Sequence, residues 1–442
     1  MSHFPLILLR ILLLFYLFSL SEAIVSSVTE TSSGTFGTWV QKKVGLAING
    51  IVNIDYDISL KDNTLSYESY ILILVISEDQ RVGYYTNLDK SDSTISSNIN
   101  SLCTAPSMHR KILTTAPLSG SYNFTVNYNN GATDIYSVAL LQCRSGYSSN
   151  PVRAHVQVTT KNPAPRGDSY NQLPIDLVML VRLYLGEIFV YSLLLLGIIG
   201  QIILAKNYAL GLHKLFAVTV LSYFILYIIK YVEVNYENSN GDTSLGLEYT
   251  SNIVQVFADT LSLASLFYLS LGWSILRQQL TQKEHNLITY AISGFFVFDM
   301  GAAICTDSDN QACQGLSLVA FIIKSLVLLA IIIAMNFTVT QLRAMLTHSP
   351  WVPSTPIQYA RCKQLQVFRL LFILYLLLPT AFLILDVTIF TWEDNWVQVV
   401  LNDFLVILMI FHIGVTFSPL QEPLLVRAFD GTAAPRPQGR TE

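Results

Sequence analysis

Ionisable residues recur inside the long apolar runs of the second half of the chain. They are Glu187, Lys230, Asp259, Asp299, Lys324, Asp386 and Asp403, with Arg182 near the start of the first run. Charged side chains are rare in such runs, and those present usually face a bundle interior or a wet cavity. Acids and bases both occur, so internal ion pairs are expected, although the sequence does not assign partners. The first seven residues are therefore our candidates for lining a polar ligand cavity.

The types and spacing of these residues argue against the common intramembrane enzymes. A metal hydrolase needs clustered His and Asp ligands, but His412 is the only histidine well inside an apolar run. An intramembrane aspartyl protease needs one aspartate in Gly-x-Gly-Asp, whereas Asp299 stands in Phe-Asp-Met-Gly. The sequence contains neither Gly-x-Ser-x-Gly nor His-Glu-x-x-His, and no phosphate-binding glycine loop. We expect no enzyme activity, no catalytic residue, no cofactor and no metal.

The elements that position these residues are membrane spans. The 442-residue chain is 52% hydrophobic and only 13% charged, against about 25% charged in soluble proteins. Seven apolar runs are each near the ~20 residues that a helix needs to cross a bilayer. We place them at 180–204, 212–232, 252–276, 287–304, 314–337, 368–390 and 397–418, within a seven-transmembrane domain at 177–419. The net charge of −4 gives no basic footprint for nucleic acid.

The N-terminus and the loop charges predict the orientation. Residues 1–23 read as a signal peptide, with Arg10 before an apolar run and Ser21-Glu22-Ala23 at the cleavage site; an uncleaved anchor helix is the alternative. If the segment before the first span is luminal, the later luminal loops hold no Lys or Arg, whereas the cytoplasmic loops hold many, such as Arg277. Such a bias is the usual topology determinant. We expect a luminal N-terminus and a disordered cytoplasmic tail at 420–442.

The cysteines agree with this orientation. Two pairs fall on the oxidising luminal side and predict disulfides: Cys103 with Cys143, and Cys305 with Cys313. Cys362 falls alone on the cytoplasmic side, as a free thiol or as a palmitoylation site. Asn123, in Asn-Phe-Thr, is a predicted luminal glycosylation site.

The depth of the intramembrane charges indicates where the cavity opens. Each charge lies within roughly 17 Å of the luminal end of its run, at ~1.5 Å per residue. The shallow residues could instead extend to the luminal headgroups: these are Arg182, Lys230 and Asp386. The deeper Asp259, Lys324 and Asp403 favour a lined cavity open to the lumen.

Residues 24–160 predict a luminal β-sandwich, so the fold class is an α+β membrane protein. The candidate strands are 45–56, 70–76, 122–128, 135–142 and 152–159. Residues 122–128 alternate aromatic or β-branched residues with polar ones, the pattern of a half-buried strand. Asn129-Asn130-Gly131 then predicts a hairpin turn that returns 135–142 as the partner strand. Residues 91–101 read as a mobile loop and 161–176 as a linker into the membrane.

Local motifs add a family resemblance. They are Leu212-His213-Lys214-Leu215, Gly272-Trp273, Arg361 to Arg369, Trp396 to Asp403, Gly414 to Pro419 and, in the luminal domain, Gly120 to Phe124. With the domain order, they resemble the GOST family, the Golgi-dynamics-domain seven-transmembrane or lung seven-transmembrane receptor-like proteins, including the intimal-thickness-related-receptor branch. The Asn-Pro-x-Gly-Tyr segment common in the family is broken after Asn162-Pro163, which leaves the branch open. The resemblance implies a GOLD-like sandwich and a protein of Golgi and endosomal membranes, with the plasma membrane as the alternative.

The function implied is membrane trafficking. We expect the sandwich to bind a luminal cargo protein or ligand and the cavity to accept a lipid or an apolar ligand group. One rival is a signalling receptor coupled to a G protein; the other is an ion channel or transporter, although no charge track crosses the cytoplasmic half. Residues 419–425 resemble an acidic dileucine signal for a cytoplasmic adaptor.

Overall fold

The computed structural model divides into two compact units: a β unit, residues 1–181 with 232–248 and 392–396, and a helical unit that contains the rest of the chain. The structure describes residues 30–32, 37–60, 69–77, 103, 109–113, 119–126, 133–144, 152–163, 170–171, 173–175, 177–205, 211–240, 244–273, 280–305, 311–348, 355–389 and 395–418. The predicted signal peptide, the loop at 91–101 and the tail at 420–442 lie outside these ranges. The two units are described in turn.

The β unit consists of two antiparallel sheets. Its strands are β1 (Glu30–Ser32), β2 (Gly37–Leu46), β3 (Ile51–Leu60), β4 (Ser69–Ser77), β5 (His109–Leu113), β6 (Ser119–Thr125), β7 (Asp134–Arg144), β8 (Val152–Pro163) and β9 (Tyr170–Asn171). One sheet has the order β1-β8-β3-β6, with β9 paired to β8, and the other has the order β2-β7-β4-β5. The predicted fold class, a β domain followed by a seven-helix domain, is thus confirmed.

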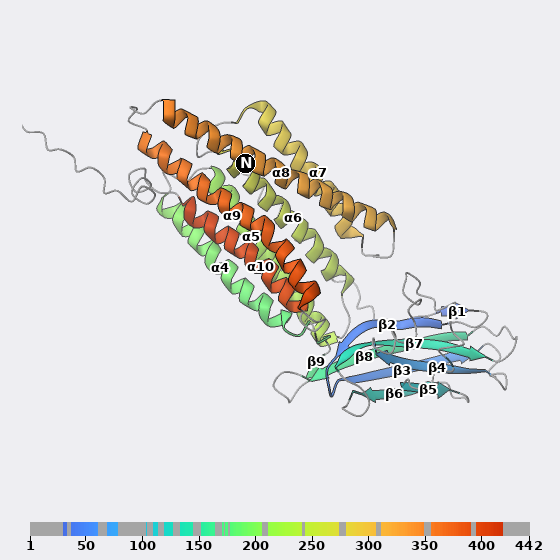
Figure 1. Ribbon diagram of the computed structural model, residues 1–442. Helices are drawn as coiled ribbons and strands as arrows, with labels where there is room; N and C mark the ends of the chain where they lie inside the picture. Colours follow the sequence, from blue (N-terminus) through green and yellow to red (C-terminus); the bar gives the residue numbers. More distant parts are fainter. Residues whose placement is uncertain are drawn as a thin grey trace, which may run out of the picture. The chain divides into compact units, whose positions relative to one another are not determined.

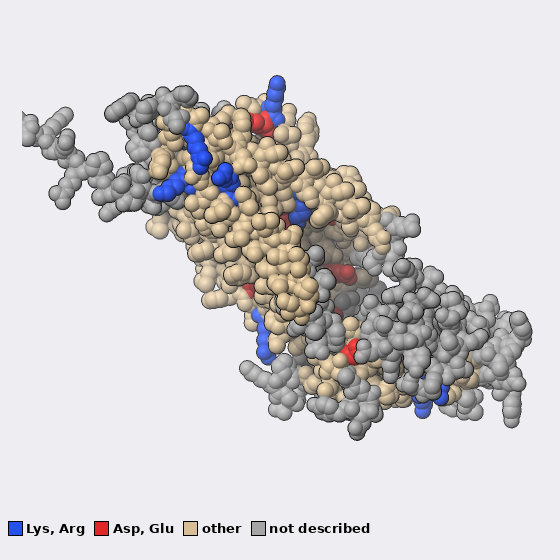
Figure 2. Space-filling model, in the orientation of Figure 1, with Lys and Arg blue, Asp and Glu red and all other residues tan. Residues whose placement is uncertain are grey.

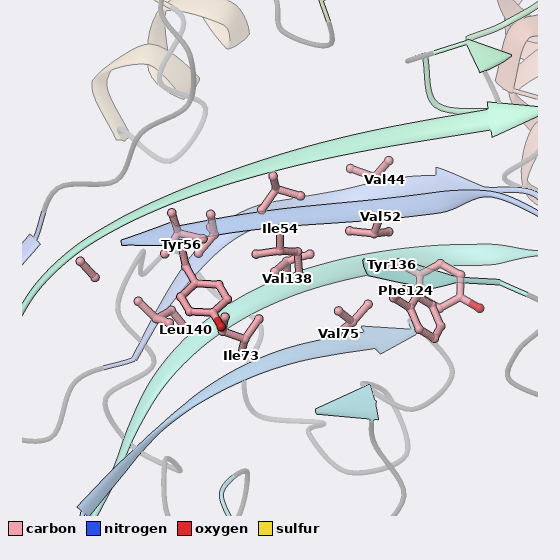
Figure 3. Close-up of a cluster of buried hydrophobic side chains, with 14 of the residues drawn as sticks. Val44, Val52, Ile54, Tyr56, Ile73, Val75, Phe124, Tyr136, Val138 and Leu140 are labelled. Carbon is pink, nitrogen blue, oxygen red and sulfur yellow. The ribbon is translucent and has the colours of Figure 1, made fainter. Parts of the chain in front are cut away.

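The core of this unit lies between the two sheets. Alternate residues of β3, such as Ile54 and Tyr56, pack with Ile73 and Val75 of β4 in one buried cluster (Figure 3). The intervening residues of β4 are buried on the outer side of their sheet, against the Cys103–Cys143 disulfide. Because β4 is covered on both faces, its sequence is continuously apolar rather than alternating.

The predicted strand at 45–56 is in fact a turn flanked by two strands. β2 ends at Leu46 and β3 begins at Ile51, and they belong to different sheets. Asn49 has a φ of 69°, and the Gly50 amide donates to the Ala47 carbonyl at 2.8 Å. Asn tolerates a positive φ better than most residues, so Asn49-Gly50 turns the chain. The apolar pattern continued across this turn and concealed it.

The predicted hairpin between 122–128 and 135–142 is also wrong. β6 pairs with β3, whereas β7 pairs with β2 and β4 in the other sheet. The alternation correctly identified the buried side of β6, with Phe124 buried and Asn123 exposed. Alternation specifies which face meets the core but not which strand lies alongside, so the partner could not be read from it.

The segment predicted as a linker, 161–176, begins inside β8 and is held by one buried amide. Asn162 is 1% exposed. Its Oδ1 accepts from the Ala47 amide at 2.9 Å, and its Nδ2 donates to the carbonyls of Gly45 at 2.9 Å and Leu173 at 2.8 Å. Asn162 therefore joins the β2–β3 turn to the segment that precedes the first helix.

The helical unit contains the membrane spans. Its helices are α4 (Leu180–Leu204), α5 (Gly211–Asn240), α6 (Leu245–Ser270), α7 (Gln282–Ile304), α8 (Gln311–His348), α9 (Thr355–Thr388) and α10 (Asn395–Thr416). Within the described part of the chain, all seven are long and apolar enough to cross a membrane, as predicted. They lie side by side as a bundle (Figure 1). α5, α8 and α9 are longer than the predicted runs.

The third span ends earlier than predicted, at Ser270 rather than 276. Gly272 has a φ of 69°. The Trp273 amide donates to the Tyr268 carbonyl at 3.1 Å and the Gly272 amide to the Leu269 carbonyl at 2.9 Å, which is the Schellman pattern of helix termination. The turn places Trp273 against Gly211, whose added Cβ would lie 3.1 Å from the indole.

We expect Gly272→Val to lower the thermal midpoint of the purified protein, because a β-branched residue at this φ costs about 1–2 kcal/mol. Differential scanning fluorimetry in detergent micelles measures the change. Gly186→Ala on α4, where an added Cβ meets nothing within 4 Å, is the matched control and should leave the midpoint unchanged or slightly raised. An unaltered midpoint for Gly272→Val would show that the turn is not strained by a side chain.

Both predicted disulfides are present. Cys103 pairs with Cys143, and Cys305 with Cys313. Cys362 is a free cysteine on α9 and is buried. Burial leaves its sulfur inaccessible in this conformation, which favours the plain thiol over the palmitoylated one.

Candidate functional site

Two helices present matching rows of polar side chains. On α4, Tyr184, Glu187 and Tyr191 follow the i, i+3, i+7 spacing that places residues on one helix face. On α5, Tyr223, Tyr227 and Lys230 follow a similar spacing. We call the membrane face at which α4 begins the first face and the opposite one the second face. Both rows begin near the middle of their helices, at Tyr191 and Tyr223, and extend toward the first face, to Tyr184 and Lys230.

The two rows pack through their aromatic rings. Tyr191 stacks on Tyr227 at a centroid distance of 5.0 Å and on Tyr223 at 5.7 Å. The Lys230 Nζ lies 5.7 Å from the ring centroid of Tyr227 and 5.9 Å from that of Tyr184, which is cation–π range. Lys230 is therefore held among rings inside the bundle instead of extending to the headgroups.

Carboxyl groups from three helices complete this site. Asp403 of α10 lies beside the Glu187 carboxyl and the Tyr227 hydroxyl and interacts electrostatically with Lys230. Asp259 of α6 accepts a hydrogen bond from the Tyr223 hydroxyl at 2.9 Å. We call this group the tyrosine–carboxyl cluster: Glu187, Tyr191, Tyr223, Tyr227, Lys230, Asp259 and Asp403.

Three buried oxygens of the cluster form no well-aligned hydrogen bond with a donor of the described residues, although the carboxyls of Glu187 and Asp403 lie beside each other, as do the side chains of Tyr191 and Tyr227. The three oxygens are Oε2 of Glu187, the hydroxyl of Tyr191 and Oδ2 of Asp403. Glu187 is 4% exposed and Tyr191 is 0% exposed, so neither can satisfy these atoms with bulk solvent. Buried polar atoms are almost always paired. These oxygens are therefore the cluster atoms whose hydrogen-bonding capacity the described residues do not satisfy with good geometry.

The cluster also contains more acidic groups than basic ones. It contains three carboxyl groups and one amine, and all four side chains are at least half-buried. Like charges brought together in a medium of low dielectric repel strongly. Among the described residues, no group of three or more His, Cys, Asp or Glu side chains is arranged to hold a metal ion.

Two further predicted cavity residues lie on helices that do not contribute to the cluster. Asp299 on α7 and Lys324 on α8 are half-buried, and Asp299 is within electrostatic range of both Lys324 and Asp259. Arg182 is exposed near the start of α4, in keeping with a side chain that reaches the headgroups. Asp386 lies on α9, but its side chain is not among those described.

A separate cavity lies in the half of the bundle nearer the second face. It is lined by α4, α5, α6, α9 and α10. Most of its lining side chains are aliphatic or aromatic, such as Ile198, Phe216 and Ile410. None of the six predicted ligand-cavity residues whose side chains the structure describes lines it.

The end of α10 beside this cavity is fixed by side chains of two other helices. The His213 Nε2 donates to the Phe417 carbonyl at 2.7 Å, and the Gln364 Nε2 donates to the Thr416 carbonyl at 2.8 Å. Carbonyls in the last turn of a helix lack intrahelical partners, and His213 and Gln364 supply them. Phe368 packs edge-on against Phe417 at 5.8 Å. Three of the motifs behind the family resemblance thus meet at one point.

Sequence reasoning missed the tyrosines of the cluster. It treated the ionisable residues one at a time, and tyrosines in apolar runs read as ordinary aromatic packing. The available signal was spacing, because each row places a charged residue three positions from a tyrosine. That the rows of α4 and α5 face each other depends on helix rotation, which the spacing does not give.

The fold and this buried site define a seven-helix membrane protein with an N-terminal β-sandwich. The family model described as the GOST seven-transmembrane domain matches residues 179–424, more than half of the chain. The chain therefore belongs to the GOST family, as the sequence motifs predicted. A comparison with curated proteins gave no match.

Proposed function

We propose that this GOST-family protein binds a luminal cargo protein or ligand and supports trafficking in the secretory and endosomal membranes, without enzyme activity. The first face of the bundle is the luminal one in this proposal. The Cys305–Cys313 disulfide joins the C-terminal end of α7 to the start of α8 at that face, and disulfides persist in oxidising compartments. At the second face, Lys and Arg side chains gather over the end of α8 and the start of α9 (Figure 2), which suits a cytoplasmic side.

The observation that carries the proposal is the set of buried oxygens without a well-aligned partner in the tyrosine–carboxyl cluster. Burying three carboxyl groups around one amine costs stability, since each must leave water. Such costly groups inside a membrane bundle are by default functional. We propose that the cluster takes a hydrogen-bond-donating or cationic group of the ligand, while the sandwich contacts the rest of a protein cargo.

The predicted result is loss of cargo handling without loss of folding. In cells lacking the protein, the double variant Glu187→Gln, Asp403→Asn should fail to restore the surface and secreted proteins that the wild type restores. Quantitative mass spectrometry of surface and secreted fractions measures this. Because both changes remove like-charge repulsion, we expect the purified double variant to have an unchanged or higher thermal midpoint.

Arg182→Gln is the matched control, since Arg182 lies on the same helix as Glu187 but is exposed. This variant should restore the levels of surface and secreted proteins as the wild type does. Full restoration by the double variant would show that the tyrosine–carboxyl cluster does not take part in cargo handling. If deletion of the protein changes neither fraction, the trafficking proposal fails. Guanine-nucleotide exchange stimulated by the purified protein would instead support the receptor alternative.

Localisation provides a second test of the proposal. A C-terminally tagged chain should reside in Golgi or endosomal membranes and carry a glycosidase-sensitive glycan at Asn123, which is exposed on β6. Stable residence at the plasma membrane would favour a receptor.

A further inference from the structure

The strands at the edges of the two sheets differ in how well they are protected against pairing with another chain. β1 and β9 have three and two residues, β2 has register shifts on either side of Gln41, and β5 carries Arg110 and Lys111. Short strands, bulges and charged residues all hinder such pairing. β6 has none of these features, because it pairs with β3 from Ser119 to Thr125 in continuous register and contains no charged residue and no proline.

The side of β6 that faces away from β3 presents backbone hydrogen-bonding groups. The Val126 amide donates to the Gly50 carbonyl at 2.9 Å, so the backbone groups of Val126 point toward the start of β3. Successive residues of a strand alternate in this direction, so the backbone groups of Ser121, Asn123 and Thr125 point away from β3. These three residues are exposed, and no described strand pairs with β6 on this side. We call this side the β6 edge.

β5 lies beside β6, across the sandwich (Figure 1). The ring centroids of His109 on β5 and Phe124 on β6 are 4.3 Å apart. Lys111 pairs with Ile73, which packs in the core between the sheets, and directly paired residues lie on the same face of a sheet. Lys111 therefore lies on the core side of β5, although it is exposed. A strand added at the β6 edge would extend the opposite sheet and bring its own core-side residues near Lys111.

From this arrangement we propose that the β6 edge binds an extended segment of a cargo protein, which adds to the sheet as a further strand. Main-chain hydrogen bonds hold such a strand, and its side chains determine the specificity. An acidic residue on the core side of the segment would pair with Lys111, whereas a basic residue would be repelled. A second copy of β6 would not supply the acid, since residues 119–125 contain no Asp or Glu.

The inference rests on the proposed function in one respect, because that function makes the partner a cargo protein. Strand addition itself can be measured on the purified chain without any trafficking assay. If deletion of the protein leaves surface and secreted proteins unchanged while strand peptides bind at the β6 edge, the trafficking proposal fails and the binding site remains.

The test uses the intact chain in detergent micelles with synthetic peptides as long as β6. The acidic probe alternates valine and threonine around a central glutamate, and the basic probe has a central lysine. Fluorescence polarisation measures their affinities, and hydrogen–deuterium exchange with mass spectrometry locates them. We expect the acidic probe to bind more tightly and to slow exchange at residues 119–125 roughly tenfold. The acidic probe with N-methylated amides should not bind, because it has no strand donors.

Lys111→Glu should reverse the preference, with the acidic probe binding roughly fivefold more weakly than to the wild type. Arg110→Glu is the matched control on the same strand. Arg110 pairs with Leu74, which lies in the cluster on the outer side of this sheet, so this variant should keep the wild-type preference.

Ser121→Pro should abolish binding of both probes, because proline removes an amide that points away from β3 and is tolerated at such edge positions. Ser121→Ala keeps the amide and should bind as the wild type does. If Ser121→Pro does not fold, the N-methylated probe tests the same hydrogen bonds from the side of the peptide.

Several results would overturn the inference. They include binding of the N-methylated probe, protection by the acidic probe only outside residues 119–125, and an unchanged preference in the folded Lys111→Glu chain. Binding confined to the Asn123→Gln chain would show that a glycan closes the β6 edge. Dimerisation of the chain that Ser121→Pro abolishes would assign the β6 edge to a second copy instead of a cargo protein.

Discussion

The variant Lys230→Met is expected to unfold roughly 4–8 °C below the wild type, in keeping with a loss of about 2 kcal/mol. Lys230 is the amine of the tyrosine–carboxyl cluster and interacts with Glu187 and Asp403. Removing one partner of a fully buried ion pair costs about 3–5 kcal/mol, whereas an exposed pair contributes less than about 1 kcal/mol. Because Lys230 is half-buried, the expected cost lies between these limits.

The measurement is thermal unfolding of the purified chain, followed by intrinsic fluorescence. Lys214→Met on the same helix is the matched control, because Lys214 is exposed and should shift the midpoint little. Adding Asp403→Asn to Lys230→Met should recover much of the loss, since the remaining carboxyl charge is smaller. Additive effects of the two changes would mean that Lys230 and Asp403 are not coupled.

The second large effect is expected in the β-sandwich. Asn162→Ala should lower the free energy of unfolding of this unit by about 3–4 kcal/mol, because it removes three hydrogen bonds and leaves buried backbone groups unsatisfied. Those groups are the Ala47 amide and the carbonyls of Gly45 and Leu173. We expect faster tryptic cleavage of the sandwich in the intact chain and a lower midpoint for its unfolding.

A second substitution separates hydrogen bonding from packing. Asn162→Asp nearly preserves the side-chain volume but places a carboxylate oxygen where the amide donated to two carbonyls, so it should be at least as damaging as Asn162→Ala. Asp55→Ala on the neighbouring β3 is the control, because Asp55 is exposed and its loss should change cleavage little. If Asn162→Asp is as stable as the wild type, the hydrogen bonds that the Asn162 amide donates do not contribute to the stability of the sandwich.

These two predictions share a physical origin. In both, a polar side chain has partners that are wholly or largely buried, so its removal costs those partners more than the bond alone. The two sites differ in whether their buried polar atoms have hydrogen-bond partners within the chain. The Asn162 side chain makes three hydrogen bonds within the chain, whereas the tyrosine–carboxyl cluster retains oxygens without a well-aligned partner at Glu187, Tyr191 and Asp403. That contrast separates a structural amide from the cluster that we propose binds a ligand.

The sequence by itself determined the features that depend on composition along one stretch of chain. Seven runs long enough to cross a bilayer, a strand-rich N-terminal region and the two cysteine pairs all followed from local chemistry, because hydrophobic length and periodicity are properties of a segment. The motifs around His213, Gln364 and Phe417 also indicated the family correctly.

Only the tertiary structure decided which segments meet. β6 and β7 follow each other in the chain but pair in different sheets, and Asn162 reaches across more than a hundred residues to the turn at Ala47. Of the charges predicted to share one cavity, those whose side chains the structure describes divide between the tyrosine–carboxyl cluster and the neighbouring Asp299 and Lys324, while the apolar cavity near the second face is lined by other residues. Helix rotation and strand pairing are determined by the packing of whole surfaces. The residue pattern of one segment therefore does not predict which other segment packs against it.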